Sequence, residues 1–226
     1  QIAAETHGFS GAHLENLLNE AAITALRDGR QEITQADLRE AVEKVMLGEK
    51  SSRLLQKEER ERVAYHEVGH AVIGELVRPG SVASITIVSR NRALGYIRQA
   101  SQDDQYLYTK DQLLQAIQVC VAGAVMEEII FGQRSTGAAN DIEQAVSLAK
   151  RMVFAGLSPL GIVSSDLPAA ELNAAVVQII QEQEKQVRKI LSSRVDEVRS
   201  IAAHLLREET MNGDEFRLLL EAKQAS

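Results

Sequence analysis

The chain has 226 residues, of which 45% are hydrophobic and 25% are charged, a composition typical of a globular protein with one large or two small domains. Its formal net charge of -7 argues against a broad nucleic-acid-binding surface. The single cysteine, Cys120, excludes an internal disulfide and fits a reducing compartment. It lies in the apolar run AIQVCVAGAV, which favours a buried thiol over a nucleophile.

Residues 1–48 are predicted to form a small helical unit. Apolar residues recur at helical spacing over residues 14–23, and Ser10 is the expected N-cap of that helix. A second helix is expected after Thr34, because Thr34 and Asp37 have the spacing of a capping box.

The rest of the chain is predicted to be mainly α with a small β-sheet. A helix from about Glu58 to Val77 ends before Pro79. Two β-rich segments, residues 81–90 and 94–101, are predicted to be strands. Further helices are expected over residues 109–131, 141–156 and 171–208, the last broken near Ser192, and a short helix closes the chain.

The sequence predicts no signal peptide or membrane span, because the longest apolar runs are too short to cross a bilayer. The chain begins at Gln1, within a helical segment, which indicates a fragment of a longer protein.

The segment YHEVGHAV carries the spacing His-Glu-x-x-His. On a helix, His66 and His70 lie on one face and can direct both imidazoles at one zinc ion. Glu67 lies on the edge of the same turn, where it can take a proton from an attacking water without ligating the metal. The alternative is a helix that carries two histidines by chance. The apolar surroundings favour a zinc hydrolase, since buried imidazoles need a partner.

A catalytic zinc site needs a third protein ligand. The other three histidines lie in segments without complementary spacing, so a carboxylate is the better candidate. Glu127 and Glu128 stand in an apolar helix, where charges are costly unless paired or ligated. Asp141 follows the segment STGAAN at a helix start, where it could simply stabilise the helix dipole. The residues alone leave this choice open.

Several blocks together resemble the FtsH-type ATP-dependent zinc metalloproteases. GFSGAHLENLLNEAA and ITQADLREAVEKVMLG resemble the helical lid of an AAA+ ATPase module. AYHEVGHAV resembles the family's zinc helix, and STGAANDIEQAVSLAKRMV and LREETMNGDEFRLLL follow in family order. The resemblance covers nearly the whole chain. It implies a lid over residues 1–48 and an α-helical zinc metallopeptidase domain over residues 49–226.

The resemblance also implies roles for the site residues. Asp141 would be the third zinc ligand beside His66 and His70, with Glu67 as the catalytic base. One member of the Glu127–Glu128 pair would then hold a ligand imidazole by its far nitrogen.

Further machinery is implied outside this chain. ATP would bind the parent protein, whose large ATPase subdomain and membrane spans would lie upstream, and Gly11 and Ala12 match lid residues that contact nucleotide. Such proteins form homo- or hetero-hexameric rings that degrade unfolded or membrane-extracted polypeptides in protein quality control. The domain would face the bacterial cytoplasm or the organellar stroma or matrix, and the fragment itself would be soluble. A strand such as residues 84–88 could pair with an extended substrate.

One departure from the family is visible: Ala122-Gly123-Ala124 stands where the family usually carries Gly-Gly-Arg. An alternative to an active protease is a catalytically silent ring subunit that assembles with active partners. The intact set of His66, Glu67, His70 and Asp141 argues against it, because a silent copy would be free to lose any of the four.

Overall fold

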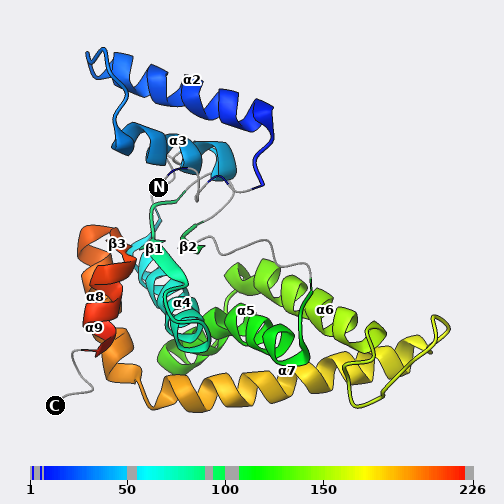
Figure 1. Ribbon diagram of the computed structural model, residues 1–226. Coiled ribbons are helices and arrows are strands. Elements are labelled where there is room, and N and C mark those ends of the chain that lie inside the picture. Colours follow the sequence, from blue (N-terminus) through cyan, green and yellow to red (C-terminus); the bar gives the residue numbers. More distant parts are fainter. Residues whose placement is uncertain are drawn as a thin grey trace.

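The computed structural model describes residues 2, 6, 8–49, 55–89, 94–99 and 107–221. Within these residues the chain is mainly α-helical with one small sheet, as the sequence predicts (Figure 1). Two helices form a separate layer near the N-terminus (Figure 1).

The N-terminal layer is a pair of packed helices, α2 (Gly11–Arg27) and α3 (Gln35–Leu47). Ser10 caps the first helix, and the predicted box of Thr34 and Asp37 starts the second. The pair buries a small apolar cluster of its own, made of Leu17, Ala21, Ala41 and Val42. The predicted division between residues 48 and 49 stays a prediction, since residues 50–54 lie outside the described residues.

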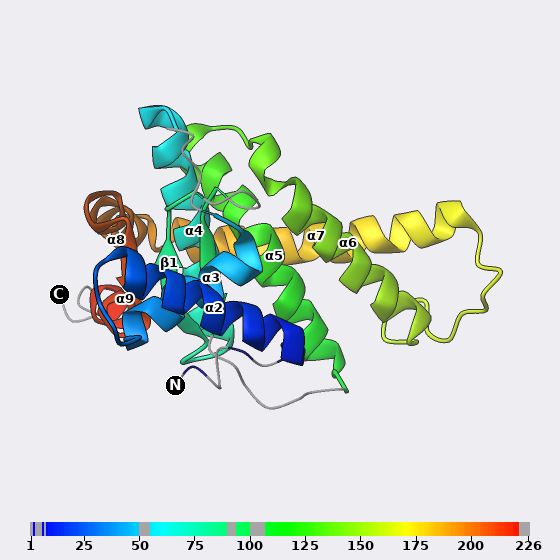
Figure 2. The same cartoon turned by 90° about the horizontal axis from the view of Figure 1, so that it is seen from above.

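The larger unit is built around α4 (Lys57–Val77), the predicted zinc helix, which packs against α5 (Lys110–Phe131). Helix α6 (Ala139–Phe154) covers α5 from one side, and α7 (Ala169–Ser192) runs beneath both (Figure 2). The break predicted near Ser192 separates α7 from α8 (Val195–Glu208), which turns back onto α4.

The sheet has the strand order β2-β1-β3 and is antiparallel throughout. It comprises β1 (Val82–Thr86), β2 (Tyr96–Gln99) and β3 (Thr210–Asn212), and α9 (Gly213–Glu221) follows directly. The sheet contacts α4, α8 and α9, while α5 packs with α4, α6 and α7. Strand β3 is not predicted from the sequence, because three residues beside a turn carry no alternating pattern of their own. Residues 91–93 of the expected turn lie outside the described residues.

The expectation that residues 84–88 pair with substrate is wrong. Strand β1 is the central strand, so both of its hydrogen-bonding edges are already used, and beyond it the backbone N–H of Ile87 donates to the carbonyl of Glu209 at 3.0 Å. An added strand needs an unpaired edge. Among the described strands, the outer positions belong to β2 and β3.

The segment between α5 and α6 is more helical than expected. A 3-10 turn, η1 (Thr136–Ala138), leads straight into α6, which begins at Ala139 and not at Asp141. Ser135 caps this turn by accepting a hydrogen bond from the backbone N–H of Gly137 at 3.2 Å. Asp141 therefore lies in the first turn of α6.

Helix α5 is long and apolar enough to cross a membrane by length and composition, contrary to the sequence expectation that every apolar run is too short. In this structure it is the central core helix, flanked by α4, α6 and α7. Its apolar character is explained by this packing.

The crossing of α4 and α5 is unusually close at Gly69. A β-carbon placed there would lie 2.7 Å from the Cβ of Met126 and 2.9 Å from the backbone oxygen of Ala122. Both distances are far shorter than van der Waals contact, so any side chain at this position would push the two helices apart.

Gly69→Ala should therefore destabilise the protein by about 1–3 kcal/mol through overpacking, measured by urea unfolding. Gly74→Ala is the matched control on the same helix, because a β-carbon there meets nothing closer than 3.7 Å. The control should be neutral or stabilising by up to about 1 kcal/mol, since alanine favours the helix. Equal stability of the two variants would contradict the close crossing.

Candidate metal centre

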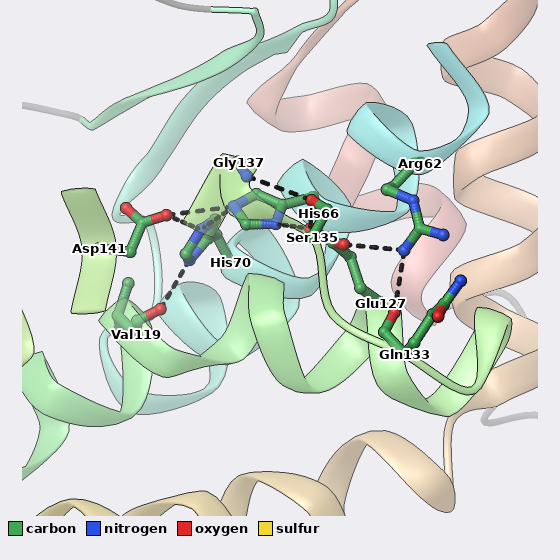
Figure 3. A network of polar contacts seen from close by, with 9 residues as sticks. All are labelled: Arg62, His66, His70, Val119, Glu127, Gln133, Ser135, Gly137 and Asp141. Carbon is green, nitrogen blue, oxygen red and sulfur yellow. Dashed lines mark hydrogen bonds and ion pairs between the residues drawn. The ribbon is translucent and has the colours of Figure 1, made fainter. Parts of the chain in front are cut away.

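The two motif histidines lie together at the face of α4 that meets α5 (Figure 3). The Nε2 atoms of His66 and His70 are 3.0 Å apart. Asp141 reaches them from α6, with Oδ2 3.2 Å from His66 Nε2 and 3.5 Å from His70 Nε2. Zinc bonds of about 2.0–2.1 Å in a tetrahedral site separate two ligand atoms by about 3.3 Å. The three ligand atoms thus have the spacing that one zinc ion requires.

The far nitrogens of both imidazoles have acceptors. His66 Nδ1 lies 2.7 Å from Glu127 Oε1, and His70 Nδ1 lies 2.6 Å from the backbone oxygen of Val119 (Figure 3). A carbonyl cannot donate, so His70 carries its proton on Nδ1 and presents the lone pair of Nε2 to the cluster. A carboxylate acceptor favours the same tautomer of His66.

The two adjacent glutamates of α5, Glu127 and Glu128, have different partners. Glu127 contacts the far nitrogen of the His66 imidazole, which is the contact expected of one member of the pair, and its role toward a zinc ligand stays a prediction. Glu128 forms ion pairs with Arg134 and Arg188, both at 2.8 Å, on a more exposed surface. Neither glutamate belongs to the group of ligand atoms formed by the two histidines and Asp141.

The charges of the cluster favour a cation. Burial tends to raise the pKa of Asp141, but the adjacent rings of His66 and His70 outweigh it and hold that pKa well below its usual range. Burial likewise disfavours the Glu127 carboxylate, and its bonds to His66, Arg62 and Ser135 lower its pKa. Two ionised carboxylates thus face the imidazoles.

Burial by itself disfavours a charged His66, but the hydrogen bonds to Asp141 and Glu127 raise its pKa to about 9. A proton therefore competes with a metal for the Nε2 atom of His66. The Glu127 carboxylate at Nδ1 makes the His66 imidazole a better electron donor toward a cation at Nε2.

Glu67 is buried beside the cluster, and burial raises the pKa of its carboxyl. The chain just before β2 passes directly over it. A β-carbon on Gly95 would lie 3.0 Å from Glu67 Oε1 and 2.7 Å from Val63 Cγ1. Gly95 could not be identified from the sequence, because its neighbours in the chain do not indicate which side chains it lies against.

A second close approach lies under the imidazoles. A β-carbon on Gly123 of α5 would lie 2.5 Å from His66 Nε2 and 2.6 Å from His70 Nε2. This glycine leaves the room in which the two ligand nitrogens meet. In the sequence, Ala122-Gly123-Ala124 is distinguished only as a departure from the family pattern, and no neighbouring residue indicates that it lies beside the metal ligands.

A cavity of about 1040 Å³ opens beside the cluster. It is bounded by α4, β2, α5 and α6, and its lining includes Glu67, Tyr96, Cys120, Asp141 and Leu148. Cys120 is half-buried there, and burial together with the nearby Asp141 raises its pKa to about 11. The thiol is thus neutral at physiological pH, which disfavours a nucleophile as predicted, but it is half-buried at the cavity wall and not fully buried.

The remaining predicted site residues lie apart from this cluster. Gly11 and Ala12 occupy the exposed first turn of α2, in the separate N-terminal layer (Figure 1). Their nucleotide contact stays a prediction. His13 belongs to the cap of the same helix, and His204 accepts a hydrogen bond from Arg207, so neither joins the metal cluster.

Comparison with known families agrees with this geometry. Residues 53–219 match the sequence profile of peptidase family M41, and residues 1–40 match that of the AAA+ lid domain. The chain belongs to peptidase family M41. This confirms the resemblance found in the sequence, and the M41 match contains all four residues of the predicted site.

Several bacterial relatives of this M41 chain are named ATP-dependent zinc metalloproteases. FtsH 3 of Petrotoga mobilis and FtsH of Bacillus subtilis are each 39% identical to it, over 97% of this chain and 38% of the relative. FtsH 1 of Methylacidiphilum infernorum is 41% identical, over 98% of this chain and 38% of the relative. The chain thus spans less than two-fifths of the length of these relatives.

The donor set of the M41 site fits the metal named in those relatives. Two neutral imidazoles and one carboxylate, with a fourth position left for water or substrate, is a ligand set typical of catalytic zinc. Both imidazoles have the second hydrogen bond that such ligands usually make.

Elemental analysis should find about one zinc per chain in the wild type and much less in Asp141→Asn, since an amide is a far weaker ligand. Asp111→Asn is the matched control, because Asp111 is also an acidic residue in a first helical turn, that of α5. Both variants lose the same dipole interaction, about 0.3–1 kcal/mol, so only a metal role separates them. Zinc retained in Asp141→Asn would move the third ligand elsewhere.

Gly123→Ala should abolish zinc binding while the protein stays helical by circular dichroism. The new methyl group would occupy the space between the ligand nitrogens, whereas alanine by itself favours an α-helix. Gly74→Ala again serves as the control and should keep its zinc. Full zinc occupancy in Gly123→Ala would show that the imidazoles meet elsewhere.

Proposed function

We propose that this chain is the proteolytic part of a zinc endopeptidase. The observation that carries the proposal is a buried carboxylate, Glu67, next in sequence to one ligand of a three-residue metal cluster and bordering the same cavity. In this proposal His66, His70 and Asp141 hold zinc, and Glu67 is the general base.

Zinc in such a site supplies Lewis acidity, polarising the scissile carbonyl and making water a better nucleophile near neutral pH. Glu67 removes a proton from the attacking water and passes it to the departing amine nitrogen. Burial raises the pKa of Glu67, which brings the carboxyl closer to the pH at which it must both accept and release that proton. Glu127 and the Val119 carbonyl keep the two imidazoles in the tautomer that faces the metal.

The substrate is an extended polypeptide segment. The cavity is bounded on one side by β2, which lies at one edge of the described sheet, and on the other by α5 and α6. A peptide added along a strand edge is bound mainly through its backbone, and this mode gives low sequence specificity. Strand β2 replaces β1 in this role, because β1 is paired on both sides.

The wider setting concerns the parent protein. There an ATPase module binds ATP, unfolds proteins and threads them into a homo- or hetero-hexameric ring of such peptidase domains, with Gly11 and Ala12 at the nucleotide contact of the lid. The match of residues 1–40 to an AAA+ lid supports this arrangement, as do the relatives' names. The parent is anchored in a membrane, with this domain on its cytoplasmic, stromal or matrix side, and degrades unfolded or membrane-extracted proteins.

Glu67→Gln should lower casein cleavage by at least about 10²-fold, because the amide cannot accept the proton, while zinc content stays unchanged. Glu61→Gln, the same change on the same helix but outside the cavity lining, should cleave at the wild-type rate. An unchanged rate in Glu67→Gln would overturn the assignment. A wild-type protein that holds zinc but cleaves nothing would favour the silent ring subunit.

A further inference from the structure

Glu127 lies near the C-terminal end of α5, and its carboxylate is nearly fully buried, with 1% of the residue exposed. Three groups donate to it. His66 Nδ1 and Ser135 Oγ lie 2.7 and 3.1 Å from Oε1, and Arg62 Nη1 lies 2.9 Å from Oε2. Burying a carboxylate is costly unless its charge is compensated. An imidazole that ligates a metal is neutral, so in the metal-bound site Arg62 is the cationic partner of Glu127 in this set.

Arg62 also contacts the chain beyond α5. The same Nη1 donates to the backbone oxygen of Gln133 at 2.9 Å, and the guanidinium lies 4.4 Å from the centre of the Phe131 ring. Arg62 precedes His66 by one helical turn on α4, so both side chains leave the same face (Figure 3). One side chain of the histidine helix thus fixes the end of α5 and the start of the segment that leads to Asp141.

Ser135 extends this network toward the third ligand. Its hydroxyl donates to Glu127 and accepts from the N–H of Gly137 in the turn that opens α6 (Figure 3). Glu127 therefore touches both halves of the metal cluster: the ring of His66 directly, and the segment carrying Asp141 through Ser135.

The geometry points to Arg62 as a positioning residue that sets the zinc affinity of the site through Glu127 without touching the metal. Arg62 balances the charge of the buried carboxylate and fixes its plane, so that Oε1 faces His66 Nδ1 and Ser135. Without Arg62 the carboxylate would be free to turn toward water, and the imidazole and the turn before Asp141 would lose a common support. The inference rests on the proposed zinc site and adds a residue to it.

The test measures the zinc dissociation constant of the full chain by competition with a chromophoric chelator. Arg62→Gln should weaken zinc binding by about 10–100-fold, the usual effect of losing an outer partner of a metal ligand. Arg62→Lys should recover most of the affinity, because a single ammonium can replace the one nitrogen that makes both bonds.

Arg60→Gln is the matched control. Arg60 lies on the same helix and also donates to one carboxylate and one carbonyl, those of Glu209 and Leu206, but these join α4 to α8. Arg60→Gln should lower the urea midpoint of the zinc-free protein less than Arg62→Gln does, because its carboxylate partner Glu209 is exposed, and it should leave zinc affinity unchanged. An equal loss of zinc affinity in both variants would reduce Arg62 to a general structural role and overturn the inference.

A double-mutant cycle tests the route through Glu127. In a Glu127→Gln background, Arg62→Gln should cost no further affinity, because its effect passes through the missing carboxylate. Additive losses would overturn the inference. If Arg62→Gln does not fold, Arg62→Met replaces it, because methionine keeps the apolar contact with Phe131 and removes the charge. A zinc affinity of Arg62→Met within twofold of the wild type would also overturn the inference. Failure of the wild type to bind zinc would instead refute the proposed site itself.

Discussion

The close crossing of α4 and α5 is the constraint on which the rest of the structure depends. Gly69 lets the backbone of α5 approach α4, and Gly123 leaves the space in which the two imidazoles meet. Two glycines in helix interiors are unfavourable for helix formation by about 1 kcal/mol each. The helix propensities of these residues therefore disfavour the crossing, and the packing of the apolar core around it must supply the free energy that offsets this cost.

The same crossing explains how the peptidase unit tolerates so many buried polar groups. His66, Glu67 and Glu127 are all less than 10% exposed. Once α4 and α5 are in contact, the polar atoms of one helix reach partners on the other: His70 reaches the Val119 carbonyl, and His66 reaches Glu127. A buried network of this kind is stable only when nearly complete, which ties the integrity of the fold to that of the site.

What the sequence could predict was local. Helix starts such as those after Ser10 and Thr34 depend on residues three apart, and the pairing of His66 with His70 depends on residues four apart. The choice of third ligand among Asp141, Glu127 and Glu128 could not be made from the residues, since it depends on how α6 and α5 lie against α4. The same reason explains why the sequence does not predict strand β3 or the roles of Gly123 and Arg62. Each has its role only through a partner distant in the chain.

The third strand has a consequence for how the protein is made. Met211 pairs with Ile85, and a β-carbon on Gly213 would collide with the carbonyl oxygen of Val82, so the chain after α8 is fitted tightly against a strand more than 100 residues upstream. During synthesis, β1 must wait with one hydrogen-bonding edge open until this segment leaves the ribosome. Such late, long-range pairing slows folding, and until it forms the unpaired edge of β1 is exposed and can pair with other chains. A nascent peptidase unit is thus vulnerable to aggregation until nearly all of it has been translated.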